Sequence, residues 1–263
     1  MRTRPLRDVR QWGYQRVVAQ KGILQFDAAP PPLAKHARSG CASTLAFEFS
    51  HAAQRIVVNC GGAACAGGLI PVRLEQGLRA SAAHSTLVID DANSTAVLMG
   101  GKIGNGVSEV DLDRRTLHGE KQGGATRLEA SHNGYVGRYG LTHRRILILR
   151  DDGTELRGED LLVPAKGKGK GKSGKVGYAI RFHLGSGIEV GLSEDGQGAG
   201  LALPDGSYWQ FRIGGETGGG QVSIEESIWA DGQGRPQPIQ QLVVQGLVSR
   251  GGGSFAWLLK KMG

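Results

Sequence analysis

Apolar and polar residues alternate along much of this chain. Residues 45–49 read Leu-Ala-Phe-Glu-Phe, and residues 178–184 read Tyr-Ala-Ile-Arg-Phe-His-Leu, so large apolar side chains recur at every second position. A period of two places one face of a β-strand against a core and the other toward solvent. No window carries a convincing apolar stripe at the helical spacing of about 3.6 residues. The pattern therefore predicts an all-β chain with few or no helices.

Short strands at near-regular spacing are predicted along the whole length. The predicted strands are residues 23–27, 44–49, 55–59, 85–90, 145–150, 178–184, 208–213, 222–229, 240–248 and 255–260. Several are separated by hairpin turn signals, namely Asp151-Asp152-Gly153, Glu194-Asp195-Gly196, Pro204-Asp205-Gly206 and Asp231-Gly232. Many short antiparallel strands favour a large multi-sheet β-sandwich of the supersandwich kind, and a barrel is the alternative.

The composition is that of one globular domain. The chain has 263 residues, of which 39% are hydrophobic and 21% charged. We interpret the Arg-rich residues 1–12 as a basic linker or remnant and residues 13–263 as one β-sandwich domain. We expect no membrane span, because no apolar run approaches the ~18 residues required, and no cleaved signal peptide at the Arg-rich start. Three cysteines, Cys41, Cys60 and Cys65, suit buried thiols better than a disulfide scaffold.

The positive charge is concentrated in one segment. The formal net charge is +8, and five lysines alternate with glycine and serine within residues 165–176. Such a segment cannot bury side chains, so it is predicted to be a mobile, solvated loop. It could also contact a polyanion. No aromatic residue interleaves the lysines as in single-strand nucleic-acid sites, so we do not expect nucleic acid as a partner.

Three of the seven histidines are candidates for chemistry. His84 follows a run of small residues and leads into a strong strand, while His132 and His143 lie at the facing ends of two strands that a hairpin could join. That hairpin would bring His132 and His143 together, and a neighbouring strand could add His84. We interpret the remaining histidines as structural, and these are His36, His51, His118 and His183.

Two chemistries would use such a cluster, and the residues alone leave both open. A zinc-like divalent ion needs two or three imidazoles and a carboxylate, for which the candidates are Glu109, Asp111, Asp113 and Glu129. A proton-abstraction site needs a neutral imidazole base, a tyrosine and a group that neutralises the substrate's acid. The common motifs of serine hydrolases, zinc proteases and P-loop enzymes are absent from the sequence.

Four motifs in order resemble the C-terminal β-sheet domain of the heparinase II/III-like polysaccharide lyase family. They are Arg79-Ala-Ser-Ala-Ala-His84-Ser-Thr, Glu129-Ala-Ser-His132-Asn-Gly-Tyr135, Gly140-Leu-Thr-His143-Arg-Arg and Leu156-Arg-Gly-Glu-Asp160. Upstream, Gly13-Tyr-Gln-Arg16 and Ile56-Val-Val-Asn59-Cys-Gly61 resemble segments that lead into that domain in bacterial relatives. The resemblance extends from about residue 12 to the end of the chain.

The resemblance implies a function and a set of site residues. Such lyases cleave heparin or heparan sulfate by β-elimination in a cleft between an α/α toroid and the β domain, and much of the catalytic set lies in the toroid. It implies a catalytic role for His84 and a structural zinc or other divalent ion held by His84 and His132. On this basis we assign substrate binding to Arg79, Tyr135 and Arg144.

Two departures from the family pattern bear on activity. Ser85 stands where the family commonly has Asn, and Asn133 stands where it usually has Asp. We therefore expect the β domain of a polysaccharide lyase that acts on an acidic glycan and needs a toroid to be active. The alternative is a non-catalytic glycan-binding or structural β-sandwich. Family members are often periplasmic, and the sequence leaves the compartment open.

Overall fold

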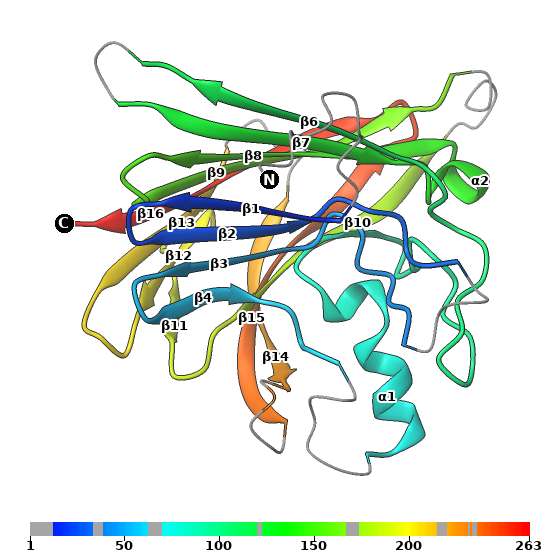
Figure 1. The fold of residues 1–263 in the computed structure, drawn as a ribbon, viewed down its shortest axis with the longest axis horizontal. Helices are drawn as coiled ribbons and strands as arrows, with labels where there is room; N and C mark the ends of the chain where they lie inside the picture. Colours follow the sequence, from blue (N-terminus) through cyan, green and yellow to red (C-terminus); the bar gives the residue numbers. More distant parts are fainter. Residues whose placement is uncertain are drawn as a thin grey trace, which may run out of the picture.

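The computed structural model describes residues 13–33, 39–62, 70–119, 123–166, 174–214, 220–230, 232 and 236–263. Two antiparallel β-sheets make up most of this part of the chain (Figure 1). The predicted all-β sandwich with few helices is confirmed. Several predicted features lie outside the described residues, namely residues 1–12, His36, Cys65, Asp231 and positions 167–173 of the Lys-Gly loop. The division at residue 12 stays a prediction.

The first sheet has eight strands. They are β1 (Tyr14–Ala19), β2 (Gly22–Asp27), β3 (Phe47–His51), β4 (Gln54–Val58), β5 (Leu87–Ile89), β10 (Lys175–Leu184), β14 (Gln221–Trp229) and β15 (Gln237–Ser249). Their order is β1-β2-β3-β4-β10-β15-β14, and β5 also pairs with β10.

The second sheet also has eight strands. They are β6 (Val110–Leu117), β7 (Ala125–His132), β8 (Leu141–Arg150), β9 (Glu155–Pro164), β11 (Glu189–Leu192), β12 (Gly198–Ala202), β13 (Tyr208–Ile213) and β16 (Gly253–Met262). Their order is β11-β12-β13-β16-β9-β8-β7-β6.

Helices are few and short in the described residues. They are α1 (Val72–Leu78), the 3-10 helix η2 (Ser81–Ala83) and α2 (Val136–Tyr139). None of them is long and apolar enough to cross a membrane. Both α1 and η2 belong to the connection from β4 to β5, which carries His84.

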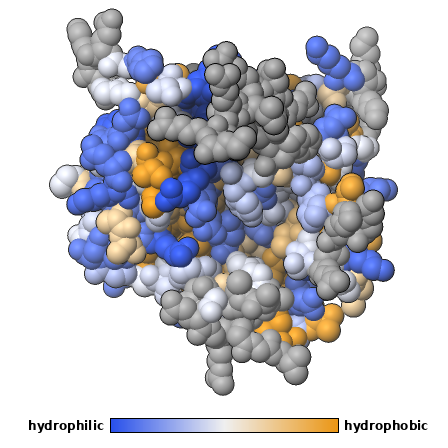
Figure 2. All heavy atoms as spheres, viewed as in Figure 1, coloured by the Kyte–Doolittle hydropathy of each residue, from blue (hydrophilic) through white to orange (hydrophobic). Residues whose placement is uncertain are grey.

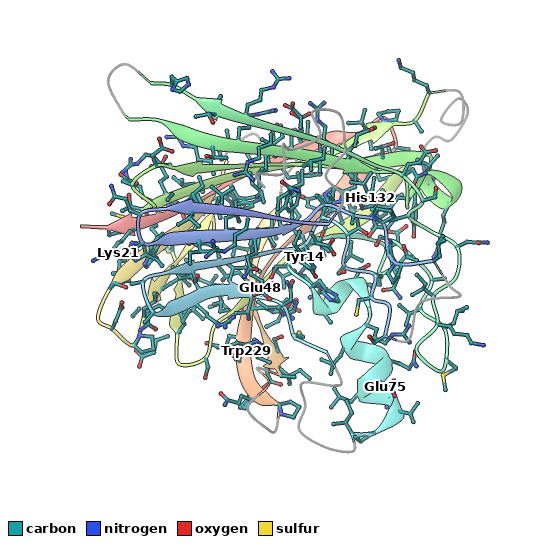
Figure 3. All side chains as sticks on the ribbon, viewed as in Figure 1. Tyr14, Lys21, Glu48, Glu75, His132 and Trp229 are labelled. Carbon is teal, nitrogen blue, oxygen red and sulfur yellow. The ribbon has the colours of Figure 1, made fainter. Side chains whose placement is uncertain are left out.

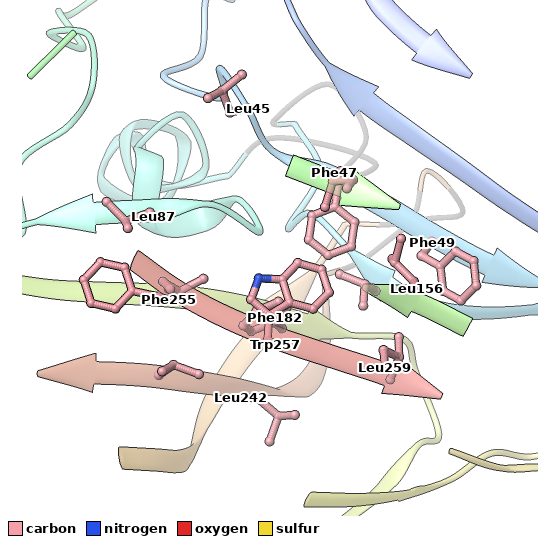
Figure 4. Packing of buried hydrophobic residues seen from close by; sticks show 14 of the residues in the cluster. Leu45, Phe47, Phe49, Leu87, Leu156, Phe182, Leu242, Phe255, Trp257 and Leu259 are labelled. Carbon is pink, nitrogen blue, oxygen red and sulfur yellow. The ribbon is translucent and has the colours of Figure 1, made fainter. Parts of the chain in front are cut away.

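Alternating side chains build the core between the two sheets. In β8, buried and half-buried residues alternate over all ten positions. The rings of Phe47 and Trp257 stack at 5.4 Å between centroids, and Phe182 meets both edge-on (Figure 4). The face seen in Figure 2 is mostly hydrophilic and carries smaller hydrophobic patches. The sheets therefore bury their apolar faces against each other.

Predicted hairpin turns lie where the sheets reverse. Gly153, Gly196 and Gly206 each follow an aspartate, and each has a positive φ, between 65° and 80°. Glycine adopts this left-handed conformation without a Cβ penalty. These turns join β8 to β9, β11 to β12 and β12 to β13, as the sequence predicts.

Candidate functional site

His84 presents one free ring nitrogen at the end of η2. Its Nδ1 lies 2.8 Å from the carbonyl oxygen of Ala80. A carbonyl only accepts, so Nδ1 carries the proton and donates. No described residue forms a hydrogen bond with Nε2, which keeps its lone pair. Burial lowers the pKa of His84 to about 4. At neutral pH this side chain is therefore an unprotonated base with a fixed tautomer.

The backbone beside His84 is fixed to the end of β4. The Ser85 amide donates to Asn59 Oδ1 at 2.8 Å, and the Ser85 hydroxyl donates to the Val58 carbonyl at 2.7 Å. Asn59 Nδ2 in turn donates to Glu48 Oε1 at 3.2 Å. Tyr14 and Glu48 lie at this same end of the first sheet (Figure 3). Ser85 thus holds the backbone next to His84 against the end of β4.

His132 and His143 form a chain of hydrogen bonds on the face of the second sheet that packs against the core. They face each other in the β7–β8 register, as the sequence predicts. The Gly134 amide donates to His132 Nδ1 at 3.1 Å, so the proton of a neutral ring lies on Nε2. His132 Nε2 lies 3.3 Å from His143 Nδ1, and His143 Nε2 lies 2.7 Å from Asp160 Oδ1. The chain therefore ends at the Asp160 carboxylate.

Arg145 neutralises that carboxylate and connects the two sheets. Its Nε and one terminal nitrogen donate to the two oxygens of Asp160, at 2.8 and 3.0 Å. Its other terminal nitrogen donates to the carbonyls of Leu45 and Ser85, both at 2.7 Å. Trp257 Nε1 adds a bond to Asp160 at 3.1 Å. Each guanidinium nitrogen of Arg145 and each carboxylate oxygen of Asp160 therefore has a hydrogen-bond partner.

The same contacts determine the protonation states. Burial alone would raise the pKa of Asp160, but the charge of Arg145 and the hydrogen bond from His143 outweigh it, and the pKa is about 2. Burial lowers the pKa of His143, and burial together with the neighbouring His143 lowers that of His132. The network thus contains one ion pair and two neutral imidazoles.

Asp160 is the carboxylate that the sequence interpretation missed. Glu129, one of the four predicted candidates, lies on β7 and pairs with Arg127 and Arg144 instead. Asp113 pairs with Arg115. The two histidines point to the opposite side of the strands, toward the core. The only available signal was the position of Asp160 within the fourth family motif.

The predicted metal ligands do not fit a shared ion in this arrangement. Both ring nitrogens of His132 are engaged, by Gly134 and by His143, so His132 has no free lone pair. His84 lies on the connection into β5 of the first sheet, and its Nδ1 is bound to Ala80. Within the described ranges, no group of three or more His, Cys, Asp or Glu side chains could hold a metal ion. A zinc or other divalent ion at His84 and His132 stays a prediction.

The three predicted substrate contacts lie in different surroundings. Arg79 is 2% exposed and donates to the carbonyls of Gly40, Leu98 and Lys102. Tyr135 is 1% exposed and donates to the Leu87 carbonyl at 3.1 Å. Arg144 has a side chain that is 42% exposed and is paired with Glu129. Arg79 and Tyr135 therefore organise the loops around His84, and binding of substrate by any of the three stays a prediction.

Comparison with known proteins places this geometry in a family. The family model described as "Heparinase II/III-like, C-terminal" matches residues 1–258. FtsZ-localized protein C from Caulobacter vibrioides is 30% identical over 210 residues, which cover 76% of this chain and 34% of that protein.

Solved structures give the same fold. The heparan sulfate lyase HepC from Pedobacter heparinus superposes with a TM-score of 0.69 at 12% identity, over 95% of this chain and 35% of that one. A crystal structure of heparinase III superposes with a TM-score of 0.69 at 15% identity, over 96% and 36%. The chain spans about a third of the length of these relatives. The matched residues and the shared two-sheet architecture together lead to one assignment: this chain belongs to the heparinase II/III-like family and carries its C-terminal β-sandwich domain.

Proposed function

We propose that this chain is the β-sheet domain of a polysaccharide lyase, in which His84 acts as the general base of β-elimination. The substrate class is a uronic-acid-containing glycan of the heparan sulfate type. One observation carries the proposal: the imidazole of His84 is neutral, and its Nε2 lone pair is bound by no described residue. That state is the one a base needs before it accepts a proton.

The proposed reaction uses the lone pair in one step. Nε2 of His84 takes the proton from C5 of the uronate, and the electron pair of that C–H bond forms the C4–C5 double bond. The C4–O bond breaks, and the leaving sugar oxygen takes a proton from an acid. The family resemblance assigns that acid, a tyrosine, to the α/α toroid. The Nδ1–H bond to Ala80 holds the ring during the transfer.

Charge and relatives support the substrate class. The net charge of +8 favours association with a polyanion. One structural relative is a heparan sulfate lyase, and the chain spans about a third of its length. We propose that a toroid domain completes the site, and that Nε2 of His84 faces the glycan.

The test is the ultraviolet absorbance of the unsaturated uronate product. The purified chain is incubated with heparin, heparan sulfate, alginate or chondroitin, alone and with the toroid half of a heparinase III added in trans. We expect product only when the toroid is present. We expect His84→Ala to reduce its rate by about a hundredfold to ten-thousandfold, the usual contribution of a general base. The matched control His118→Ala changes an exposed histidine and should retain the rate.

A second candidate function is a non-catalytic binding domain. It is favoured because the relative with 30% identity is named for localisation with FtsZ, not for a lyase reaction. It also suits the internal contacts of Arg79 and Tyr135. This candidate predicts glycan binding without product under every toroid condition, or co-sedimentation of the chain with FtsZ polymers. Product that depends on His84 would contradict it.

A further inference from the structure

A cleft of about 910 Å³ opens beside the connection that carries His84. It lies between α1 and η2 on one side and the ends of β10, β14 and β15 on the other. Glu75 on α1 and Trp229 at the end of β14 are labelled in Figure 3 and show where these two elements lie. Its walls are apolar and include Leu74, Leu78, Ile188, Ile228 and Ile239. The volume is within the range of small-molecule sites.

The floor of the cleft contains a hydrogen-bonded group of polar side chains. His183 Nε2 lies 3.1 Å from the Ala82 carbonyl, which only accepts, so Nε2 carries the proton. The bare Nδ1 then accepts from the Ser227 hydroxyl at 2.7 Å. Cys60 Sγ lies 3.6 Å from Ser227 Oγ. Ser227 has two lone pairs, so even when one accepts from the thiol the other stays available as an acceptor.

The charged group at the cleft is negative. Glu226 lines it and is exposed, and it forms no ion pair with a described residue. The neighbouring Glu225 is different, because Arg181 pairs with it at 3.1 Å. No Lys or Arg is found among the described residues that line the cleft. An available acceptor and a carboxylate with no ion-pair partner among the described residues, beside apolar walls, favour a ligand that donates hydrogen bonds and carries positive charge.

We infer that this cleft binds an organic ammonium ion with an apolar body, at a site separate from the glycan site of the proposed lyase. The apolar body lies against Leu74, Leu78 and Ile239. The ammonium group donates to Ser227 Oγ and approaches the Glu226 carboxylate. A sulfated or uronate-bearing glycan has the opposite charge and lacks an apolar body, so it does not compete for the cleft.

The inference is tested with three probes that share an indole body. Tryptamine carries an ammonium, tryptophol a hydroxyl and indolepropionate a carboxylate, and each is titrated into the full chain by isothermal calorimetry. We expect saturable one-to-one binding of tryptamine, binding of tryptophol weaker by about two- to fivefold, as for an exposed ion pair, and weaker binding again of indolepropionate. Equal affinity for all three, or the tightest binding by indolepropionate, would overturn the inference.

Two matched variants locate the charge. Glu226→Gln should lower the affinity for tryptamine to that for tryptophol and leave tryptophol unchanged. Glu225→Gln removes a carboxylate from the same strand outside the cleft and should change neither. Ser227→Ala should weaken the binding of both hydrogen-bond donors, tryptamine and tryptophol. Thermal melting of each variant shows whether the fold is retained. A Glu226→Gln variant that is folded and binds tryptamine as before would rule out the proposed contact.

A competition experiment distinguishes this inference from the proposed lyase function. Heparan sulfate should not displace tryptamine, and His84→Ala should bind tryptamine with unchanged affinity. Displacement by heparan sulfate would show that the cleft belongs to the glycan site and would overturn the inference. Absence of lyase product would leave it intact.

Discussion

At the scale of single residues, the strongest constraint is the ion pair enclosed between the sheets. Asp160 and Arg145 both have side chains with no exposed area. Burying two charges costs more than a surface pair can return, and the cost is offset only when every donor and acceptor is satisfied. Here His143 and Trp257 donate hydrogen bonds to the Asp160 carboxylate, and the carbonyls of Leu45 and Ser85 accept hydrogen bonds from the Arg145 guanidinium. Removing one partner leaves a buried charge without compensation.

We therefore expect Asp160→Asn to reduce the free energy of unfolding by about 3–5 kcal/mol. Urea unfolding followed by tryptophan fluorescence measures this loss. The matched control is Glu159→Gln, the adjacent carboxylate on the outer face of β9, which should change the free energy by no more than about 0.5 kcal/mol. If Asp160→Asn reduced the free energy of unfolding no more than Glu159→Gln does, the folded state would not depend on the charge of Asp160 to compensate Arg145.

At the scale of elements, the sequence predicts strands whose inward positions are apolar. β13 (Tyr208–Ile213) has the predicted bounds, and β10, β14 and β16 differ by a few residues. β9 was missed because its inward positions include Gly158 and Asp160, which break the apolar alternation. β6 was missed because it is an edge strand with exposed charged residues. The pairing of His132 with His143 was predictable from one hairpin, whereas the place of His84 and Asp160 depends on contacts across the sandwich that spacing does not encode.

Gly158 shows why such a position resists prediction. It faces Trp257 on β16, and a Cβ at residue 158 would lie 2.0 Å from the indole ring. The ring cannot move freely, because it stacks on Phe47 and contacts Phe182. The indole ring of Trp257, on the neighbouring strand, thus fills the space that a side chain at residue 158 would take.

We expect Gly158→Ala to destabilise the domain by about 1–3 kcal/mol or more, since overpacking displaces the stacked rings. The near-ultraviolet circular dichroism of Trp257 should change, and the melting temperature should fall. Gly191→Ala is the control, because a Cβ there meets nothing within 4 Å. A similar melting temperature for both variants would show that the core accommodates the extra methyl group.

At the scale of the whole molecule, the buried histidines make stability depend on pH. Burial lowers the pKa of His84 to about 4 and that of His183 to about 3, and it also lowers the pKa values of His132 and His143. In the unfolded chain such groups titrate near 6.5. Between pH 7 and pH 5 the unfolded state takes up protons that the folded state does not, so acid favours unfolding. Asp27 acts in the opposite direction, because burial raises its pKa to about 6.

We expect the free energy of unfolding to fall as the pH is lowered from 7 to 5, by up to about 2 kcal/mol for each buried histidine, less the opposing contribution of Asp27. Urea titrations at the two pH values measure the difference. His84→Gln should reduce the fall by about one histidine's share, while His118→Gln, at an exposed position, should leave it unchanged. A stability that rises on acidification would mean that the buried rings are protonated in the folded state.

The bonds from Arg145 to Leu45 and Ser85 have a consequence for how variants of this domain are interpreted. Ser85 follows His84 directly, so the position of the proposed base is determined in part by a guanidinium on the opposite layer. A screen that scores only loss of activity would return Asp160, Arg145 and Trp257 alongside His84. Such a screen would assign these residues to the reaction although their side chains are buried between the sheets. Activity divided by the amount of folded protein separates two causes, because a deficit caused by misfolding disappears after that correction, whereas a deficit at the base, or in how Arg145 positions it, does not.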